Sequence, residues 1–222
     1  MDKNLRDVIL KRINRTSENL LKNNMEVYYA STKEDVPEIV EGLLNEGDVV
    51  ANGGTMTMKE CNLSELLNSG KYKYLDREAI AHSEVKNLYR ASFSADAYIT
   101  SANAITENGC LYNVDGNSNR VAAIAYGPDK VIVIAGYNKI VPTLDDAVRR
   151  VKCEAAPANC QRLESGTYCY KTGQCMSMKN PDSILTDGCS SEDRICCNYL
   201  ISAYQREKGR IKVILVGEIL GY

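Results

Sequence analysis

The chain has 222 residues, and its 27 lysines and arginines against 29 aspartates and glutamates give a net charge of −2. This balance argues against a nucleic-acid-binding protein, because such a protein usually presents a basic surface. No apolar run approaches the roughly 18 residues that a membrane-spanning helix needs, so we expect no membrane segment. The N-terminus is charged and amphipathic, unlike a secretory signal, and the protein is therefore expected in the cytoplasm.

The first half of the chain alternates between helical and extended patterns. Apolar residues recur every three or four positions from Leu5 to Leu21, which predicts a helix that ends at Asn23-Asn24. Strands are expected at 26–30 and 49–51, with a weaker one at 72–75. Helices are expected after a cap at Ser31 or Thr32, through residues 60–67, and over residues 83–93. This alternation favours an α/β fold in which helices cover a mostly parallel sheet.

The second half contains the clearest strand signals. Residues 97–106 are extended, and Glu107-Asn108-Gly109 before a second extended run at 110–114 predicts a hairpin. Residues 130–135 and 211–216 would present apolar side chains on both faces of a strand, which is typical of buried strands. Helices are predicted at 119–125, from a cap at Thr143 past residue 151, and at 195–204. No interdomain linker is visible, so one α/β domain over residues 1–222 is expected.

The loop after the second predicted strand is the first candidate for a ligand site. It reads Asn52-Gly53-Gly54-Thr55-Met56-Thr57 and precedes a predicted helix. Two glycines allow close approach of a ligand, a helix N-terminus favours an anion, and Thr55 and Thr57 add hydroxyl groups. The loop matches neither a Walker motif nor a dinucleotide fingerprint, so no nucleotide cofactor is predicted. The alternative is a tight turn with a threonine cap.

Three further positions could take part in chemistry. Glu107, at the hairpin turn, could act as a nucleophile or general base, although a solvated glutamate on a type I′ turn is the alternative. Asn119 and Arg120 open a short helix, where Arg120 could clamp a carboxylate or phosphate through two N–H groups or form a structural ion pair. Asn138 and Lys139 follow the strongest strand, where Lys139 could bind an anion or remain a solvated loop lysine.

The cysteines gather in one loop-rich segment, residues 167–197. Cys169, Cys175, Cys189 and Cys196 lie in it at spacings that match no standard zinc finger or ferredoxin. In a reducing compartment such a cluster indicates zinc or an iron–sulfur cluster, and free, partly buried thiols are the alternative. His82 is the only histidine, which makes a hydrolase triad improbable.

Four stretches together resemble the LUD-domain family of lactate-utilisation proteins. They are the run from Ala95 to Val141, which contains T-S-A-N-A-I-T-E-N-G-C and V-I-V-I-A-G-Y-N-K-I-V, and V-V-A-N-G-G-T-M-T, A-A-P-A-N-C-Q-R-L and R-I-K-V-I-L-V-G-E-I-L-G-Y. The tail C-Y-K-T-G-Q-C … C-S-S-E-D-R-I-C is similar to a cysteine-bearing subgroup, in which the cysteines stand closer together. Residues 176–188 therefore resemble an insertion.

The resemblance implies a fold like that of ribose-5-phosphate isomerases and CoA transferases. In those folds the loop at Gly53-Gly54-Thr55 would hold phosphate or CoA, and Glu107-Asn108-Gly109 is similar to the motif that carries the nucleophilic glutamate of class I CoA transferases. The family is associated with lactate oxidation beside iron–sulfur oxidoreductase subunits.

Three hypotheses follow from the residues and the resemblance. The first is an accessory protein of an organic-acid pathway that binds a carboxylate, phosphate or CoA. The second is a CoA-transferase-like or sugar-phosphate-isomerase-like enzyme that uses Glu107. The third is a non-catalytic scaffold that docks a partner through its cysteine segment.

Overall fold

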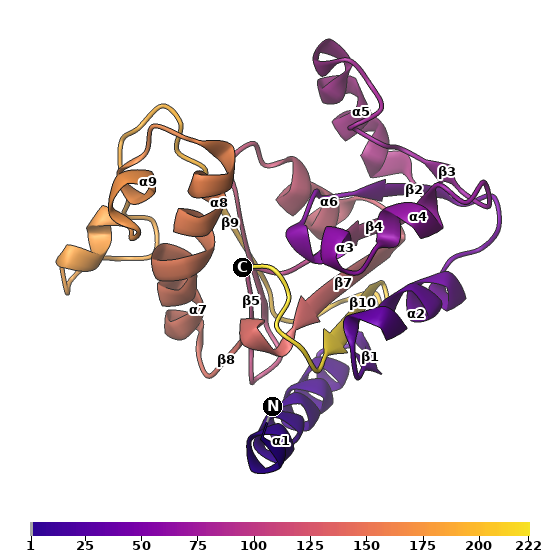
Figure 1. Ribbon diagram of the computed structural model, residues 1–222, viewed down its shortest axis with the longest axis horizontal. Helices are drawn as coiled ribbons and strands as arrows, with labels where there is room; N and C mark the ends of the chain where they lie inside the picture. The colour runs from indigo at the N-terminus through magenta and orange to yellow at the C-terminus, as the bar shows by residue number, and fades with distance from the viewer. Residues whose placement is uncertain (1) are drawn as a thin grey trace.

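A large sheet of six parallel strands forms the centre of the computed structural model, which describes residues 2–222 (Figure 1). Its strands, in spatial order, are β1 (Glu26–Ala30), β10 (Ile211–Val216), β7 (Lys130–Gly136), β4 (Ala97–Thr100), β2 (Val49–Asn52) and β3 (Lys73–Tyr74). Val131 and Val133 of β7 pack into one apolar layer, whereas Ile132 and Ile134 pack into the other. The α/β fold with a mostly parallel sheet is thereby confirmed.

Helices cover both faces of the large sheet. Helices α1 (Lys3–Lys22) and α6 (Asn119–Tyr126) supply Ile13, Leu20 and Ile124 to one layer. The opposite layer receives apolar side chains from three helices, α2 (Val36–Leu43), α3 (Met56–Glu60) and α4 (Leu63–Leu67). The helix expected through residues 60–67 is broken between α3 and α4, because Asn62 adopts a left-handed conformation with φ of 52°. The expected helix at 83–93 is α5 (Val85–Ala91) flanked by two 3₁₀ turns.

A small second sheet stands beside the large one. Its strands, in spatial order, are β8 (Ile140–Val141), β5 (Ala104–Thr106), β6 (Leu111–Asp115) and β9 (Asn198–Ser202). The extended segment expected at 97–106 is divided between the two sheets, since β4 ends at Thr100 and β5 begins at Ala104. Outside the small sheet lie α7 (Leu144–Arg150), a π-helical turn (Val151–Ala155) and α8 (Ala156–Leu163), at the left of Figure 1.

The predicted hairpin is confirmed, because β5 and β6 pair in antiparallel fashion. Its turn, however, is not type I′, which requires two consecutive residues with positive φ. Only Gly109 has a positive φ there, 85°, and its N–H donates to the carbonyl of Thr106 over 2.8 Å. A side chain at Gly109 would collide with the Asn19 backbone, since its Cβ would lie 2.6 Å from that carbonyl carbon.

The helix expected at residues 195–204 is wrong, because Asn198–Ser202 form β9 at the edge of the small sheet. The run N-Y-L-I-S is too short for its apolar pattern to distinguish a helix from a strand. Pairing with β6 decides the outcome, because Tyr112 lies opposite Ile201 and Val114 lies opposite Tyr199. The cysteine segment is otherwise mostly loop, with α9 (Tyr168–Thr172) and a 3₁₀ turn (Met176–Lys179). None of the helices within residues 2–222 combines the length and the apolar character that crossing a membrane requires.

Candidate functional site

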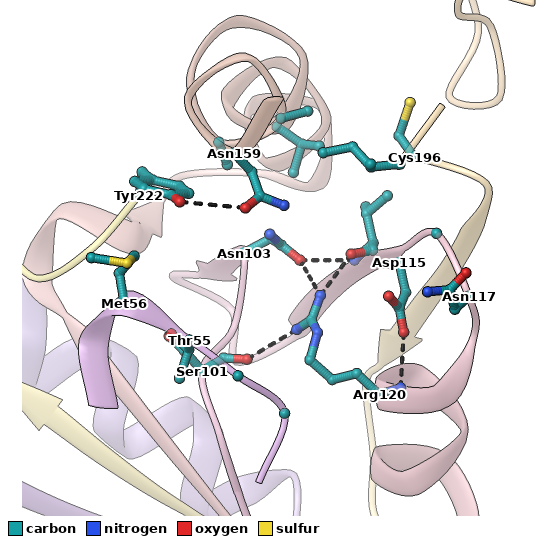
Figure 2. A pocket seen from close by; sticks show the side chains of 18 of the residues that line it. Thr55, Met56, Ser101, Asn103, Asp115, Asn117, Arg120, Asn159, Cys196 and Tyr222 are labelled. Carbon is teal, nitrogen blue, oxygen red and sulfur yellow. Dashed lines mark hydrogen bonds between the residues drawn. The ribbon is translucent and has the colours of Figure 1, made fainter. Parts of the chain in front are cut away.

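A cavity of about 330 Å³ lies where the parallel strands of the large sheet end (Figure 2). Gly53 follows β2, Ser101 follows β4 and Lys139 follows β7, so the ends of three neighbouring strands bring residues to one edge of the sheet. Ligands of open α/β folds collect at this edge, because the loops there converge around a crevice. The opposite wall comes from α8 and from the end of the cysteine segment. The polar side chains that line the cavity are those of Thr55, Arg77, Tyr89, Ser101, Asn103, Asp115, Asn117, Asn119, Arg120, Lys139, Asn159, Arg162 and Tyr222.

Cationic side chains dominate the charge of this pocket. Arg77, Arg120 and Arg162 line it together with Lys139, whereas Asp115 supplies the only lining side-chain carboxylate among the described residues. That carboxylate is already engaged, because its Oδ2 accepts the backbone N–H of Arg120 over 2.8 Å at the start of α6. The pocket of a chain with a net charge of −2 therefore carries local positive charge.

The Arg120 guanidinium forms the floor of the pocket (Figure 2). Its two terminal nitrogens donate to the carbonyls of Ser101 and Val114, and to the side-chain oxygens of Asn103 and Asn113, over 2.6–3.3 Å. An arginine has five N–H donors, and four of these are directed at protein acceptors. Arg120 thus offers a ligand its charge rather than the free two-pronged clamp that its position in the sequence suggested.

The loop at Gly53 and Gly54 lines the pocket but does not present free amides to it. The N–H of Gly53 donates to the Ile99 carbonyl over 2.9 Å, and that of Gly54 donates to Asn52 Oδ1 over 2.7 Å. The following helix, α3, has only five residues. Gly54 has a φ of 61°, and the Arg77 guanidinium packs against its Cα, where a side chain would have to stand. The glycines therefore make room for an arginine.

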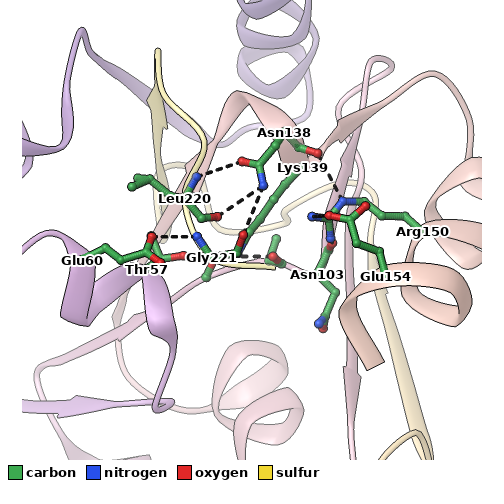
Figure 3. Close-up of polar contacts among 11 residues, drawn as sticks. Thr57, Glu60, Asn103, Asn138, Lys139, Arg150, Glu154, Leu220 and Gly221 are labelled. Carbon is green, nitrogen blue, oxygen red and sulfur yellow. Dashed lines mark hydrogen bonds and ion pairs between the residues drawn. The ribbon is translucent and has the colours of Figure 1, made fainter. Parts of the chain in front are cut away.

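Lys139 lines the pocket but is almost fully buried, with 1% of its surface exposed. Figure 3 shows it among its polar neighbours. Its Nζ donates to Thr57 Oγ1 over 3.2 Å and to Ser101 Oγ over 2.9 Å. Burial, reinforced by the charges of Arg150 and Arg120, lowers the pKa of Lys139 to about 7. Thr57 is itself fully buried and contacts the lysine instead of the pocket.

Asn138 does not line the pocket either, but it contacts the C-terminal segment that does. Its Oδ1 accepts the Leu220 N–H over 3.1 Å, and its Nδ2 donates to the Gly221 carbonyl over 3.3 Å (Figure 3). These bonds hold the segment that carries Tyr222, whose hydroxyl accepts from Arg162 Nε over 2.9 Å. Asn138 therefore positions residues at the rim of the pocket.

Glu107 lies apart from the pocket, against α1. Its carboxylate pairs with Arg12 Nε over 2.7 Å and with Arg15 over 3.2 Å. Glu107 does not line the pocket, and both of its partners belong to α1, which contributes no residue to the pocket. The structure thus separates Glu107 from Arg120 and Lys139, and a catalytic role for Glu107 stays a prediction.

The four cysteines singled out in the sequence line one small apolar cavity of about 20 Å³. Cys169 and Cys175 are buried, and Cys189 and Cys196 are partly buried. Burial raises the pKa of the Cys169 thiol to about 11, and Cys160 Sγ lies 3.5 Å from its sulfur. Within residues 2–222, no three side chains of the metal-binding types are close enough together to hold a metal ion. Cys196 lines both this cavity and the cationic pocket.

Several residues of the pocket were not predicted, and most of these carry no signal in the sequence. Arg77 comes shortly after the weak strand β3, so the rule that ligands gather beyond strand ends could have indicated it. Asn103 lies between β4 and β5, where a single long strand was expected. Asn159 and Arg162 sit on α8, whose approach to the pocket depends on how the small sheet stands against the large one.

Comparison with known proteins identifies the family. The family model of the LUD domain matches residues 13–216. No curated protein sequence matches the chain. Solved structures that resemble it include a DUF162 family protein from Deinococcus radiodurans, at 16% identity and a TM-score of 0.48, over 94% of this chain and 98% of that one. Ribose 5-phosphate isomerase A from Neisseria gonorrhoeae is similar at 16% identity and a TM-score of 0.34, over 61% and 66% of the two chains. The beta subunit of eIF2B from Chaetomium thermophilum has 18% identity and a TM-score of 0.37, over 52% and 45%. Since the family model covers most of its length, the chain belongs to the LUD-domain family.

Proposed function

We propose that this lactate-utilisation-type protein binds an anionic small molecule in the pocket at the carboxyl edge of the large sheet. The observation that carries the proposal is the excess of positive charge there, three arginines (Arg77, Arg120 and Arg162) against one side-chain carboxylate that is already hydrogen-bonded. Buried or partly buried cations without matching anions are costly, and a bound carboxylate or phosphate would offset that cost.

The size of the pocket favours a small ligand. Its volume of about 330 Å³ lies at the lower end of the range of about 300–1,000 Å³ that is usual for small-molecule sites. A small organic acid or phosphate ester fits this space, whereas a whole CoA molecule would extend beyond it. Arg162 is exposed at the rim and is the side chain best placed to meet an arriving anion.

Calorimetric titration tests this proposal. We would titrate the protein with hydroxy acids, 2-oxo acids, phosphate esters and CoA, and repeat the titration with Arg162→Gln and with Arg206→Gln, an exposed arginine outside the pocket. Arg162→Gln removes one charged hydrogen bond to the anion, so its dissociation constant should be roughly 10-fold higher or more. Arg206→Gln should bind the anion as tightly as the unaltered protein. If no anion binds the unaltered protein, the proposal fails. A partner lost on deletion of residues 167–194 would then favour the scaffold alternative.

The cysteine segment is proposed to hold zinc or an iron–sulfur cluster. Four thiols around one cavity suit either group chemically, because thiolates are the preferred ligands of both. Cys169, Cys175, Cys189 and Cys196 would be the ligands, and the bound metal would supply structural cross-linking or electron transfer. Their sulfurs would first have to be drawn together, since the described residues hold no ready ligand group.

Anaerobic purification followed by metal analysis and a visible spectrum tests the metal proposal. Iron with absorbance near the blue end of the spectrum would support a cluster, and stoichiometric colourless zinc would support a structural site. Metal-free protein in which all five thiols of the segment can be titrated would refute it. Cys153→Ser, which alters an exposed cysteine outside the small cavity, is the matched control for Cys175→Ser.

The proposed setting is an oxidative organic-acid pathway in the cytoplasm, beside iron–sulfur oxidoreductase subunits, and membership of the LUD-domain family supports it. An enzyme that uses Glu107, of the CoA-transferase or sugar-phosphate-isomerase type, is the alternative. Its decisive test is Glu107→Gln, because the amide keeps the shape of the side chain but cannot act as nucleophile or base. Unchanged turnover of an identified substrate would exclude that alternative.

A further inference from the structure

Lys139 is buried without a counter-ion. Across residues 2–222, no carboxylate lies within ion-pairing distance, 4.0 Å, of its Nζ. Its two hydrogen-bond partners, Thr57 and Ser101, are neutral hydroxyl groups. Buried lysines are ordinarily paired with an acid, because an isolated buried ammonium is costly. The surroundings of Lys139 therefore favour the neutral amine over the charged form.

The hydrogen bonds are also those of a neutral amine. Such an amine has two N–H groups and one lone pair, and the two hydroxyl oxygens of Thr57 and Ser101 account for the two N–H groups. The Ser101 hydroxyl donates to the Ala102 carbonyl over 3.4 Å, so that its oxygen is free to accept from Lys139. The lone pair then remains available on a nitrogen that belongs to a pocket-lining side chain.

The charges that face Lys139 come from four neighbouring elements. Arg150 of α7 and Arg120 of α6 disfavour its protonation, whereas Glu60 of α3 and Glu154 of the π-helical turn favour it. The carboxylate of Glu154 is partly neutralised, because it pairs with Arg150 over 2.9 Å. Glu60 accepts the Gly221 N–H over 2.7 Å. The arginines therefore outweigh the acids, which agrees with the lowered pKa of Lys139, about 7.

We propose that Lys139 is a nucleophilic amine that forms an imine with the carbonyl group of an anionic oxo compound bound in the pocket. This inference rests on the proposed binding of an anion, and it adds the chemistry of the ligand. The arginines that line the pocket would hold the carboxylate or phosphate, and the Lys139 amine would meet the carbonyl carbon. Lowered lysine basicity by burial and by neighbouring cations is a recognised means of activating this nucleophile.

The step is balanced without a redox partner. The nitrogen lone pair attacks the carbonyl carbon, and a C–N bond forms as the carbonyl π bond opens. Both N–H hydrogens leave with the carbonyl oxygen as one water molecule, and the carbon–nitrogen double bond remains. The Thr57 and Ser101 hydroxyls accept these N–H groups in the free protein, so they are placed to relay the two protons to the departing oxygen.

Reductive trapping tests the proposal with the full-length protein at neutral pH. Cyanoborohydride supplies hydride to convert an imine into a stable secondary amine, which peptide mass mapping locates. We would use glyoxylate as the oxo carboxylate, glyceraldehyde 3-phosphate as the oxo phosphate and propionaldehyde as an uncharged aldehyde. With a pKa of about 7, the unprotonated fraction of Lys139 near pH 7 is on the order of 1,000-fold above that of an ordinary lysine.

The matched control is Lys152→Arg, because Lys152 is also buried but donates to the Ile184 carbonyl and lines only the cysteine cavity. One adduct per chain, on Lys139, is expected with one of the two anionic aldehydes, at least 10-fold faster than with propionaldehyde. Lys139→Arg should abolish this adduct and Lys152→Arg should not. Which anionic aldehyde is trapped distinguishes an oxo acid from a sugar phosphate.

Calorimetry with glycolate and with glycerol phosphate, which have no carbonyl group, separates the two proposals. If either anion binds but neither anionic aldehyde gives an adduct on Lys139, the imine proposal is overturned while anion binding stands. Equal trapping of propionaldehyde would overturn it too, since the pocket would then not be selecting an anion. If no anion binds and no adduct forms, both proposals fail.

Discussion

Replacing Arg120 with methionine tests how much this arginine, at the floor of the pocket, contributes to the stability of the fold. Its guanidinium donates to four acceptors, but these differ in their access to water. Ser101, Asn103 and Val114 line the pocket, so water can replace the lost donors there. Asn113 is fully buried and does not line the pocket, and its Nδ2 already lacks a partner. The cost of Arg120→Met should therefore concentrate on the Asn113 side chain.

The expected magnitude follows from that difference. Leaving one buried acceptor unpaired costs about 1–3 kcal/mol, and the weaker, water-exposed bonds add about 1 kcal/mol more. Arg120→Met should thus lower the free energy of unfolding by about 2–4 kcal/mol, which corresponds to a drop in melting temperature of about 4–16 °C for a chain of this size. Circular dichroism in a urea titration measures the change, because the protein contains no tryptophan.

Two further variants make this prediction refutable. The double variant Arg120→Met with Asn113→Leu should regain at least half of the lost stability, because both members of the pair are then apolar. Arg162→Met, at the exposed rim of the same pocket, should cost less than about 1 kcal/mol. If the unfolding free energy of Arg120→Met lies within about 0.5 kcal/mol of that of the unaltered protein, Asn113 does not depend on Arg120 for its hydrogen bond and the reasoning is incorrect.

Three other predictions concern the remaining residues of the site. Glu107→Gln should leave anion binding unchanged and cost about 1 kcal/mol at most in unfolding free energy, because its arginine pairs are partly exposed; weaker binding would contradict the separation of Glu107 from the pocket. Gly54→Ala should cost about 1–2 kcal/mol and weaken anion binding, because it strains a residue at φ of 61° and displaces Arg77; unchanged binding would show that Arg77 does not contact the ligand. For Lys139 the folded pKa, about 7, lies below that of an unfolded lysine, so the unfolded chain binds more protons between the two values. Stability should therefore rise with pH from about 7 towards 10 by a few kcal/mol relative to Lys139→Met, and parallel pH profiles of the two proteins would refute the lowered pKa.

The central strands of the large sheet could be predicted because a short run of apolar residues is enough to indicate a buried strand. The runs at 130–136 and 211–216 are apolar on both faces, and only a strand covered on both sides suits such a run. The edge strand β9 of the small sheet could not be predicted in this way. The run at 198–202 suits a helix as well as a strand, because five residues cannot reveal their period and only pairing with β6 makes them a strand.

The residues of the candidate site were likewise predictable only in part. Loops that follow strands identified Gly53 and Lys139, since the carboxyl ends of parallel strands share one edge of a sheet. The start of a predicted helix identified Arg120. The sequence could not show that Gly54 gives room to Arg77, or that Arg120 is already hydrogen-bonded to four acceptors. Both facts depend on which distant segments meet.

The sequence by itself therefore determined the α/β fold, the family, and the edge of the sheet at which polar side chains gather. Tertiary structure alone decided the chemical state of those side chains. Lys139 follows a strand like any loop lysine, yet packing buries it near Arg150 and Arg120, with no carboxylate of the described residues within ion-pairing distance. Desolvation and neighbouring charge act through space and not along the chain, and for that reason the character of the site emerges only when the elements are assembled.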